Sequence, residues 1–301
     1  MKIVDTTVLS TDGVHKLSGR VYVPEGEAVG YLQIVHGMAE HIERYDSFMQ
    51  TMAENGYICF GYDHLGHGHT AEKSELGFIA SSDGWKHLCL DVERFASAVR
   101  SEYGNMPYYL MGHSMGSFIV RLAVTMGSRP SKLIVMGTGG PNPAAGAGIF
   151  LCNLISALFG EKHISGAING IAFGAYNKRF PGEESKAWLT TVAEQRDKYV
   201  ADPLSGFDFT VSAMKDLMIL NRDSNSAETT EKTPKDMPML LVSGEDDPVG
   251  EYGRGVEAAC ERYKAAGCRA EMKLYKGARH EILNDFCREE AVSDIQKFLS
   301  L

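Results

Sequence analysis

The sequence predicts an α/β fold in which a mostly parallel sheet is covered by helices on both faces. Short apolar runs alternate along the chain with amphipathic stretches, which is the rhythm of parallel strands joined by crossover helices. The 301 residues are 44 % hydrophobic and 23 % charged, as is ordinary for a globular enzyme. Such a length is sufficient for one large domain with an insertion.

The first elements form an antiparallel pair, and a regular alternation of strands and helices follows. Residues 7–9, with their flanks, and 17–23 alternate in hydrophobicity around the turn Thr11-Asp12-Gly13, so we expect them to pair as a hairpin. The next expected elements are strand 31–35, helix 45–54, strand 57–62, helix 84–103, strand 108–111, helix 117–126 and strand 133–137.

The alternation stops at the Gly- and Pro-rich stretch 139–143. The segment that follows is rich in Gly, Ala, Phe and Met and predicts helices and loops. Alternation resumes with strand 239–243, helix 255–266, strand 270–275 and helix 289–301. We therefore expect a core built from residues 1–140 and 237–301, with residues 141–236 inserted between two late strands as a helical cap.

Composition and charge exclude several classes of function. The net charge is −9 and no basic run occurs, which argues against a nucleic-acid partner. The six cysteines form no CxxC pair, and the first residues lack the apolar core of a signal peptide, so we expect free thiols and a cytoplasmic location. The apolar stretch 144–160 is shorter than the roughly 20 residues of a spanning helix. It predicts a lid helix, with at most transient membrane contact. Nothing in the sequence addresses the oligomeric state.

The pentapeptide Gly112-His113-Ser114-Met115-Gly116 lies between an expected strand and an expected helix. This is the setting of a nucleophile elbow, in which a sharp turn exposes the serine hydroxyl and the glycines let neighbouring backbone pass close by. Free N–H groups at the start of the following helix can hold an oxyanion. The motif in this context predicts Ser114 as a nucleophile in an α/β-hydrolase fold.

A serine hydroxyl needs a base, and the base needs a carboxylate to orient it. In this fold the acid and then the histidine follow the serine in the chain. Of the two histidines after Ser114, His163 falls in the insertion, whereas His280 follows the strand 270–275. The acid is expected after the strand 239–243, where Glu245, Asp246 and Asp247 are all candidates.

His36-Gly37-Met38 follows the strand 31–35, where this fold builds the other half of its oxyanion hole. We expect the Met38 and Met115 amides to donate to the oxyanion. The histidines at 64, 67 and 69 are separated by glycines and lack zinc-ligand spacing, so we predict no metal and no cofactor.

Five motifs together resemble the monoacylglycerol lipase and lysophospholipase group of the α/β-hydrolases, which is also classed with serine aminopeptidase-like hydrolases. Residues 188–207 look like bacterial lysophospholipase-type members, and Thr70 departs from the serine of many members. The resemblance implies Asp247 as the acid and a cap over an acyl-binding channel. The motifs are His36-Gly37-Met38-Ala39-Glu40-His41 with Arg44-Tyr45, residues 63–69, residues 112–116, residues 244–249 and residues 275–281.

The expected function is hydrolysis of a monoacyl lipid ester, a monoacylglycerol or lysophospholipid, through an acyl-enzyme. Expected substrate contacts are His36, Gly37, Glu40 and His113 within the motifs, and Ile149, Phe150, Leu154 and Leu158 in the cap. The cap side chains would line an acyl tunnel or would simply pack the cap onto the core. The alternatives are a short-chain carboxylesterase, a thioesterase or a peptidase with the same triad, and a ligand-binding homologue without catalysis.

Overall fold

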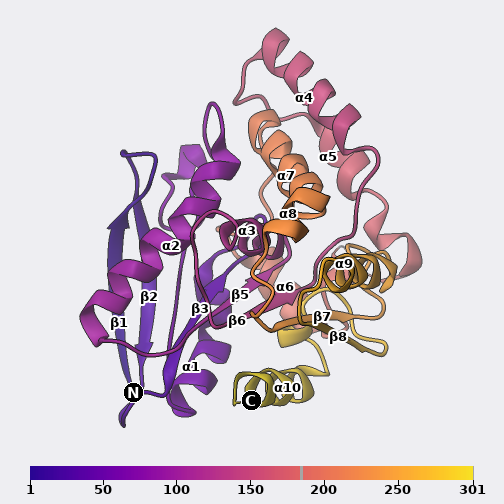
Figure 1. The fold of residues 1–301 in the computed structure, drawn as a ribbon. Helices are drawn as coiled ribbons and strands as arrows, with labels where there is room; N and C mark the ends of the chain where they lie inside the picture. Colours follow the sequence, from indigo (N-terminus) through magenta and orange to yellow (C-terminus); the bar gives the residue numbers. More distant parts are fainter. Residues whose placement is uncertain (184–185, 301) are drawn as a thin grey trace.

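The computed structural model describes residues 1–183 and 186–300, and it forms an eight-stranded sheet between two layers of helices (Figure 1). The strand order is β1-β2-β4-β3-β5-β6-β7-β8. β2 runs antiparallel to β1 and β4, and the other neighbours are parallel. The strands are β1 (Lys2–Leu9), β2 (Lys16–Val23), β3 (Gly30–Val35), β4 (Tyr57–Tyr62), β5 (Tyr108–His113), β6 (Lys132–Met136), β7 (Met239–Gly244) and β8 (Ala270–Tyr275).

Helices of the core cover both faces of the sheet because alternate strand residues point to opposite sides. Leu32 and Ile34 of β3 belong to the hydrophobic cluster on the face of α1 and α10, whereas Tyr31 and Val35 belong to the cluster on the face of α2, α3 and α9. Strands β3, β4 and β7 are buried throughout, which explains their continuous apolar sequences. The core helices are α1 (Asp46–Glu54), α2 (Gly84–Tyr103), α3 (Met115–Ala123), α9 (Arg254–Ala265) and α10 (Arg288–Ser300).

The chain between β6 and β7 forms the helical cap, so the predicted insertion between two late strands is confirmed. α7 lies against α2 and α3 of the core and also packs on α4, which with α5 forms the outer part of the cap (Figure 1). The cap helices are α4 (Ala145–Phe159), α5 (Gly166–Phe173), α6 (Ala193–Ala201), α7 (Val211–Ser224) and α8 (Ala227–Lys232). Short 3₁₀ turns are η1 (Ile42–Tyr45), η2 (Lys73–Glu75), η3 (Tyr176–Arg179), η4 (Ala187–Leu189) and η5 (Ile282–Asn284).

The expected α/β fold is confirmed, and the differences lie at element ends. β5 continues to His113, and α3 begins at Met115, two residues before the expected start, because the elbow turn has no loop between strand and helix. Tyr45 belongs to the 3₁₀ turn before α1. The last helix is seen to Ser300, and the expected final residue Leu301 lies outside the described residues.

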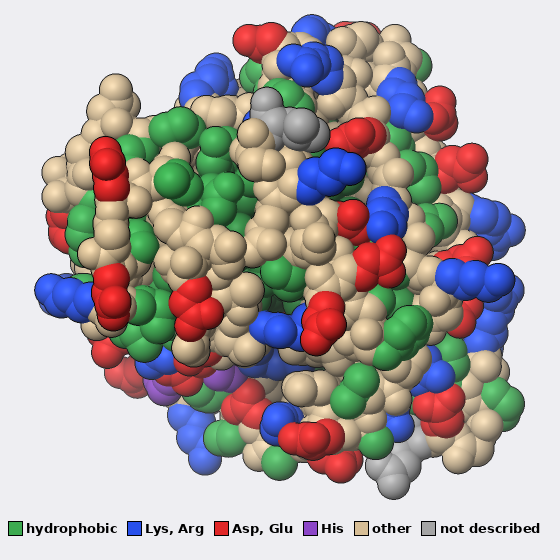
Figure 2. Space-filling model, turned by 90° about the horizontal axis from the view of Figure 1, so that it is seen from below, with side chains coloured by type: hydrophobic (Ala, Val, Ile, Leu, Met, Phe, Trp, Pro, Cys, Tyr) green, Lys and Arg blue, Asp and Glu red, His purple; other side chains and the backbone are tan. Residues whose placement is uncertain are grey.

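The surface and the cysteines agree with the composition. Acidic and basic side chains are interspersed over the face in Figure 2, without a continuous basic area on that face. All six cysteines are buried free thiols. Within residues 1–183 and 186–300, no helix is long and apolar enough to cross a membrane.

Candidate active site

Ser114 occupies a strained turn between β5 and α3. Its φ of 54° and ψ of −118° lie in a region that non-glycine residues rarely adopt, and such strain is common at functional turns. A Cβ at Gly116 would overlap the carbonyl oxygen of Val35, and one at Gly112 would overlap that of Gly116. The two glycines are therefore needed for β5, α3 and β3 to meet this closely, which gives the elbow predicted from the pentapeptide.

Asp247 and His280 are brought together from the loops after β7 and β8. The His280 Nδ1–H donates to Asp247 Oδ2 at 2.9 Å, and both side chains are buried. Asp247 also accepts from the Ser243 hydroxyl at 3.0 Å and from the Val249 N–H at 2.8 Å. Glu245 and Asp246 are exposed. Of the three carboxylates expected after β7, the one paired with the histidine is therefore Asp247.

Ser114 and His280 both lie at the carboxyl end of β6. The Ser114 N–H donates to the Met136 carbonyl at 2.9 Å, and a Cβ at Gly137 would lie 3.1 Å from His280 Cε1. Gly137 has a φ of 59°, so glycine suits the turn in two respects. Among the described residues, the Ser114 hydroxyl has no hydrogen bond in this structure. Catalytic hydrogen bonds often tighten only around substrate.

The oxyanion loop, residues 36–39, passes directly over the serine. A Cβ at Gly37 would lie 3.0 Å from Ser114 Cβ, and Ala39 has a φ of 52°. Met115 is the first residue of α3, where an N–H has no partner inside the helix. Among the described residues, no acceptor is bonded to the Met38 N–H. Neither amide is therefore committed to another acceptor within the part of the chain that the structure describes.

Three buried histidines, His36 of the oxyanion loop and the neighbouring His64 and His67, support the backbone of this loop. The Ala39 N–H donates to His67 Nε2 at 3.2 Å, the His64 N–H donates to His36 Nε2 at 3.1 Å, and the His36 ring lies 4.1 Å from that of His64. Burial lowers the pKa of all three, to about 3 for His64 and about 4 for His67. The rings are therefore neutral spacers bonded to backbone. Among the described residues, no group of three His, Cys, Asp or Glu side chains could hold a metal ion.

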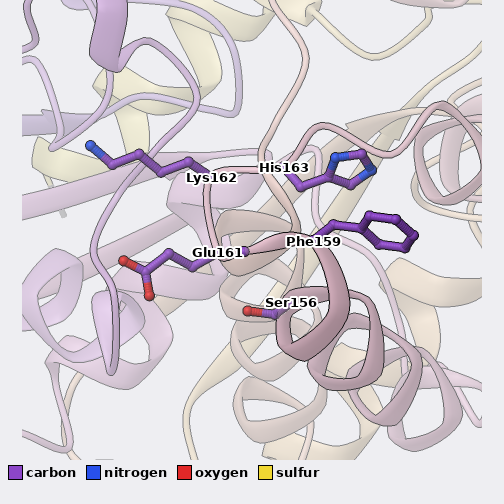
Figure 3. Close-up of a pocket in the computed structure, with 6 residues that line it drawn as sticks. Ser156, Phe159, Glu161, Lys162 and His163 are labelled. Atoms are coloured by element: carbon purple, nitrogen blue, oxygen red, sulfur yellow. The ribbon is translucent and has the colours of Figure 1, made fainter.

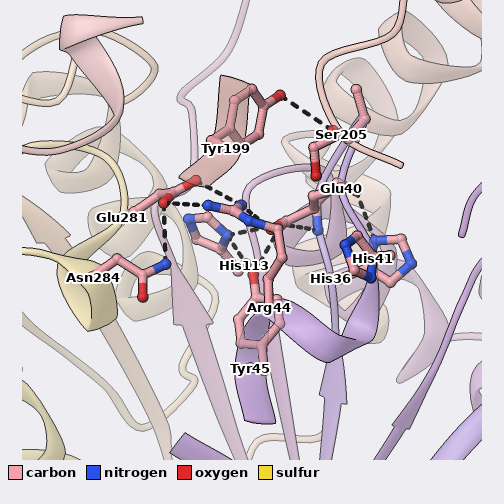
Figure 4. A network of polar contacts seen from close by, with 12 residues as sticks. His36, Glu40, His41, Arg44, Tyr45, His113, Tyr199, Ser205, Glu281 and Asn284 are labelled. Atoms are coloured by element: carbon pink, nitrogen blue, oxygen red, sulfur yellow. Dashed lines mark hydrogen bonds and ion pairs between the residues drawn. The ribbon is translucent and has the colours of Figure 1, made fainter. Parts of the chain in front are cut away.

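A buried charged network joins the three loops of the site (Figure 4). Glu40 accepts from the Gly37 N–H at 2.6 Å and from Arg44 at 2.6 Å. Arg44 also forms a two-pronged ion pair with Glu281, with both distances at 2.8 Å. His113 lies 3.3 Å from Glu40 through Nδ1 and 3.3 Å from the His280 carbonyl through Nε2. The network thus links the oxyanion loop, the elbow and the histidine loop.

The charged groups of this network stabilise one another's ionised forms. Burial alone would raise the pKa of Glu40, but the hydrogen bond with His113 and the Arg44 charge hold it well below its usual range. Burial would lower the pKa of His113, and Glu40 instead raises it. A buried charge pair that loses one partner is strongly destabilised, so these residues depend on one another.

Four motif residues were expected to contact substrate, and the structure gives three of them other partners. His36, Glu40 and His113 are buried and bonded to protein groups, as described above. Their polar atoms are occupied, so we assign them to positioning the loops. Gly37 remains beside Ser114. No pattern in the sequence indicated that Glu281, which directly follows His280, is the ion-pair partner of Arg44.

The expected tunnel residues of α4 lie mostly at the surface. Phe150, Leu154 and Leu158 are 70 %, 48 % and 67 % exposed, and only Ile149 is half-buried. In this structure these three side chains neither enclose a tunnel nor pack the cap onto the core, because α4 packs on α7 through its opposite side. An open depression at the end of α4 is lined by Ser156, Phe159 and residues 160–163 (Figure 3). It contains no residue of the catalytic loops.

Cap residues that sequence reasoning missed lie against the histidine. The Trp188 ring is 5.1 Å from the His280 ring, and the Tyr176 ring is 5.0 Å from that of Trp188. His280 also lies 4.7 Å from the His113 ring. The imidazole thus contacts both a cap residue and an elbow residue. The motif 188–207 marked this segment, but nothing in its pattern indicated which ring faces the site.

Comparisons with known proteins agree with this geometry. The family model described as Serine aminopeptidase, S33, matches residues 26–286. A "Monoglyceride lipase homolog" of Monkeypox virus is 27 % identical over 250 residues, covering 83 % of this chain and 80 % of the relative. "Monoglyceride lipase" of Rattus norvegicus is 25 % identical over 280 residues, covering 91 % and 82 %. A thermostable carboxyl esterase from Bacillus coagulans, solved in complex with glycerol, superposes with a TM-score of 0.94 at 27 % identity, over 100 % of this chain and 98 % of the other.

Proposed function

The chain belongs to the serine aminopeptidase S33 family of hydrolases, and from this premise we propose that it is a serine hydrolase of monoacyl lipid esters. The substrates would be monoacylglycerols or lysophospholipids, cleaved through an acyl-enzyme. The observation that carries the proposal is that the strained elbow serine, Ser114, and the buried pair of His280 and Asp247 lie at the same end of the sheet, beside the carboxyl end of β6. No cofactor is needed for this chemistry.

In the proposed reaction His280 Nε2 takes the Ser114 proton as the hydroxyl oxygen attacks the ester carbonyl carbon. Asp247 holds the proton on Nδ1 and stabilises the imidazolium. The tetrahedral intermediate collapses, and the imidazolium gives its proton to the departing alcohol. Water then attacks the acyl-serine with the same base, which releases the fatty acid and restores the serine.

The oxyanion of each tetrahedral intermediate would be held by the Met38 and Met115 amides. A single donor of this kind typically contributes about 3–4 kcal/mol to the transition state. Glu40 supports the loop by accepting from the Gly37 N–H, and the neutral His67 accepts from that of Ala39. These contacts fix the Met38 amide between two anchored residues, so the donor is oriented before substrate binds.

The apolar surface of the cap, residues 141–236, favours a lipid as the substrate. α4 has no charged residue along its length and exposes Phe150, Leu154 and Leu158, with Ile171 of α5 also exposed. Such an apolar surface suits transient contact with the bilayer in which monoacyl lipids partition. The relatives that are named monoglyceride lipases, and the carboxyl esterase that was solved with glycerol, support an ester of this class.

Initial rates on p-nitrophenyl esters with acyl chains of two to sixteen carbons test the proposal, with Ser114→Ala as the blank. We expect serine-dependent rates that peak at medium or long chains, followed by turnover of monoacylglycerol or lysophospholipid. A maximum at acetate would favour a short-chain carboxylesterase. If no ester is turned over, amide and thioester panels decide between a peptidase, a thioesterase and a binding protein.

A further inference from the structure

The segment 187–191 of the cap runs beside the loop that carries His280. The Glu281 N–H donates to the Leu189 carbonyl at 2.7 Å, and the His280 N–H donates to that of Trp188 at 3.4 Å. The Thr190 hydroxyl donates to the Asn284 carbonyl at 2.8 Å. The cap thus pairs with the histidine loop at three consecutive residues, through the backbone carbonyls of Trp188 and Leu189 and the side chain of Thr190.

Arg279, the residue before His280, stabilises this pairing. Its guanidinium forms a two-pronged ion pair with Glu183, at 2.8 and 2.6 Å, and donates to the Ala187 carbonyl at 2.7 Å. It also lies over the Phe180 ring, 4.0 Å from the centroid. All of these partners belong to the cap, and the arginine is only 9 % exposed. A planar guanidinium suits both the carboxylate and the ring, and a lysine would match neither as well.

The position of the cap segment 187–191 determines which cap side chain contacts the His280 ring. Trp188 belongs to the segment 187–191, and its ring lies 5.1 Å from that of His280. An aromatic face near an imidazolium stabilises the positive charge that develops during proton transfer. It also restricts the ring to the orientation in which Nδ1 meets Asp247.

We propose that Arg279 is a positioning residue for His280, which acts by clamping the cap segment 187–191 and its Trp188 against the histidine loop. This inference rests on the proposed function, because it assigns His280 as the base. It goes further by making the cap a part of the catalytic machinery. The contribution is made through orientation, since Arg279 itself is turned toward the cap.

Arg196 provides a matched control. It is also a buried arginine, and it donates to the Thr190 carbonyl at 2.8 Å and lies 3.7 Å from Glu183. It reaches them from α6, and no contact joins its side chain to the histidine loop among the described residues. Arg196→Met therefore removes a buried arginine that shares Glu183 and the Thr190 carbonyl with Arg279, while Arg279 keeps all of its own contacts with the cap.

The test compares Arg279→Met, Arg279→Lys and Arg196→Met with wild type by thermal unfolding and by kcat, KM and the pH profile on a p-nitrophenyl ester. For Arg279→Met we expect a 10- to 100-fold lower kcat, the usual order for a displaced catalytic group, with KM changed less than kcat. The acid limb of its kcat/KM profile should also shift. Arg279→Lys should recover part of the loss, and Arg196→Met should keep kcat within about threefold at a similar loss of stability. Comparable kcat in Arg279→Met and wild type, or an equal loss in both methionine variants, would overturn the proposal.

A second readout needs no ester. The proton that His280 Nδ1 shares with Asp247 should give a downfield ¹H NMR signal in wild type and in Arg196→Met. We expect that signal to shift or broaden in Arg279→Met, and an unchanged signal would contradict the positioning role. Should Arg279→Met fail to fold, Glu183→Gln removes the carboxylate charge that faces Arg279 and Arg196 but leaves the bond from Arg279 to the Ala187 carbonyl, and it is expected to give a smaller change in the same direction. A wild-type chain that hydrolyses no ester, yet shows the expected NMR difference, would refute the proposed function alone.

Discussion

Asp216 of α7 places a carboxyl group in the interface between the cap and the core. It is buried beside the start of α2, where a Cβ at Gly84 would overlap its Oδ2. Its Oδ1 has no hydrogen-bond partner among the described residues. Burial raises the pKa of Asp216 to about 7, and the nearby Asp83 charge raises it further. The hydrogen bond from the Trp85 N–H and the Lys215 charge lower the pKa but do not outweigh burial. The group therefore titrates close to neutral pH.

The sign of the effect on stability follows from the proton count. An aspartate in the unfolded chain ionises near pH 3.8, whereas the native group keeps its proton to about pH 7. Between these values the native state binds more protons, so the free energy of unfolding falls as pH rises. At about 1.4 kcal/mol per pH unit, the full loss is about 4 kcal/mol, reached above pH 7. Below pH 4 both states are protonated and the loss disappears.

Asp216→Asn keeps the shape and removes the charge, so it should match wild type near pH 4 and exceed it by up to about 4 kcal/mol at pH 8. Urea unfolding from pH 4 to pH 9, with the midpoint and slope of each curve, measures this difference. Asp223→Asn, in the same helix but at a half-buried position paired with Arg222, controls for the change in net charge. A stability difference between wild type and Asp216→Asn that does not change with pH would refute the assignment of the charge cost to this site.

Two further predictions concern the buried histidines and the cap surface. The pKa values of about 3 for His64 and about 4 for His67 lie below the usual 6.5, so the unfolded chain takes up protons first as pH falls and native stability is lost from about pH 6.5 downward. His67→Gln should lessen that loss in acid unfolding curves, and identical curves would argue against it. Phe150→Ser with Leu154→Ser should lower co-sedimentation with phosphatidylcholine vesicles at least tenfold, because each large apolar side chain contributes about 1.5–3 kcal/mol when buried. Hydrolysis of a short soluble ester should be unchanged, and unaltered sedimentation would remove the cap face from the membrane-contact proposal.

The sequence was most informative where burial leaves a periodic signal. β4, β8 and α2 have the predicted bounds because apolar runs and a one-sided helix pattern end at clear turn residues. The loop positions of Asp247 and His280 could be predicted because parallel strands bring their carboxyl ends to one edge. Asp247 could be singled out only by the family resemblance until its hydrogen bond with His280 was seen.

The parts that could not be predicted are those without a periodic signal. α4 is apolar on every side, so no polar stripe indicates which face is buried, and Phe150 emerged at the surface. The partners Arg44 and Glu281 are 237 residues apart, and a charge in a sequence carries no sign of its partner. The same holds for Arg279 and Glu183, which are 96 residues apart in the chain and meet only because the cap segment lies beside the histidine loop.

The cap is hydrogen-bonded to both the oxyanion loop and the loop that carries His280, so a motion of the cap would affect both loops. On the oxyanion side, the Ala39 carbonyl accepts from the Tyr199 hydroxyl at 3.2 Å and from the Gly206 N–H at 2.9 Å, and His41 lies 2.7 Å from Asp202. On the histidine side, residues 187–191 pair with the loop of His280. A displacement of residues 187–206 would therefore disturb the base and the oxyanion donors together. A cap motion that leaves the site intact is therefore one of the outer helices α4 and α5 rather than of this inner segment, and Phe150, Leu154 and Leu158 of α4 and Ile171 of α5 are exposed.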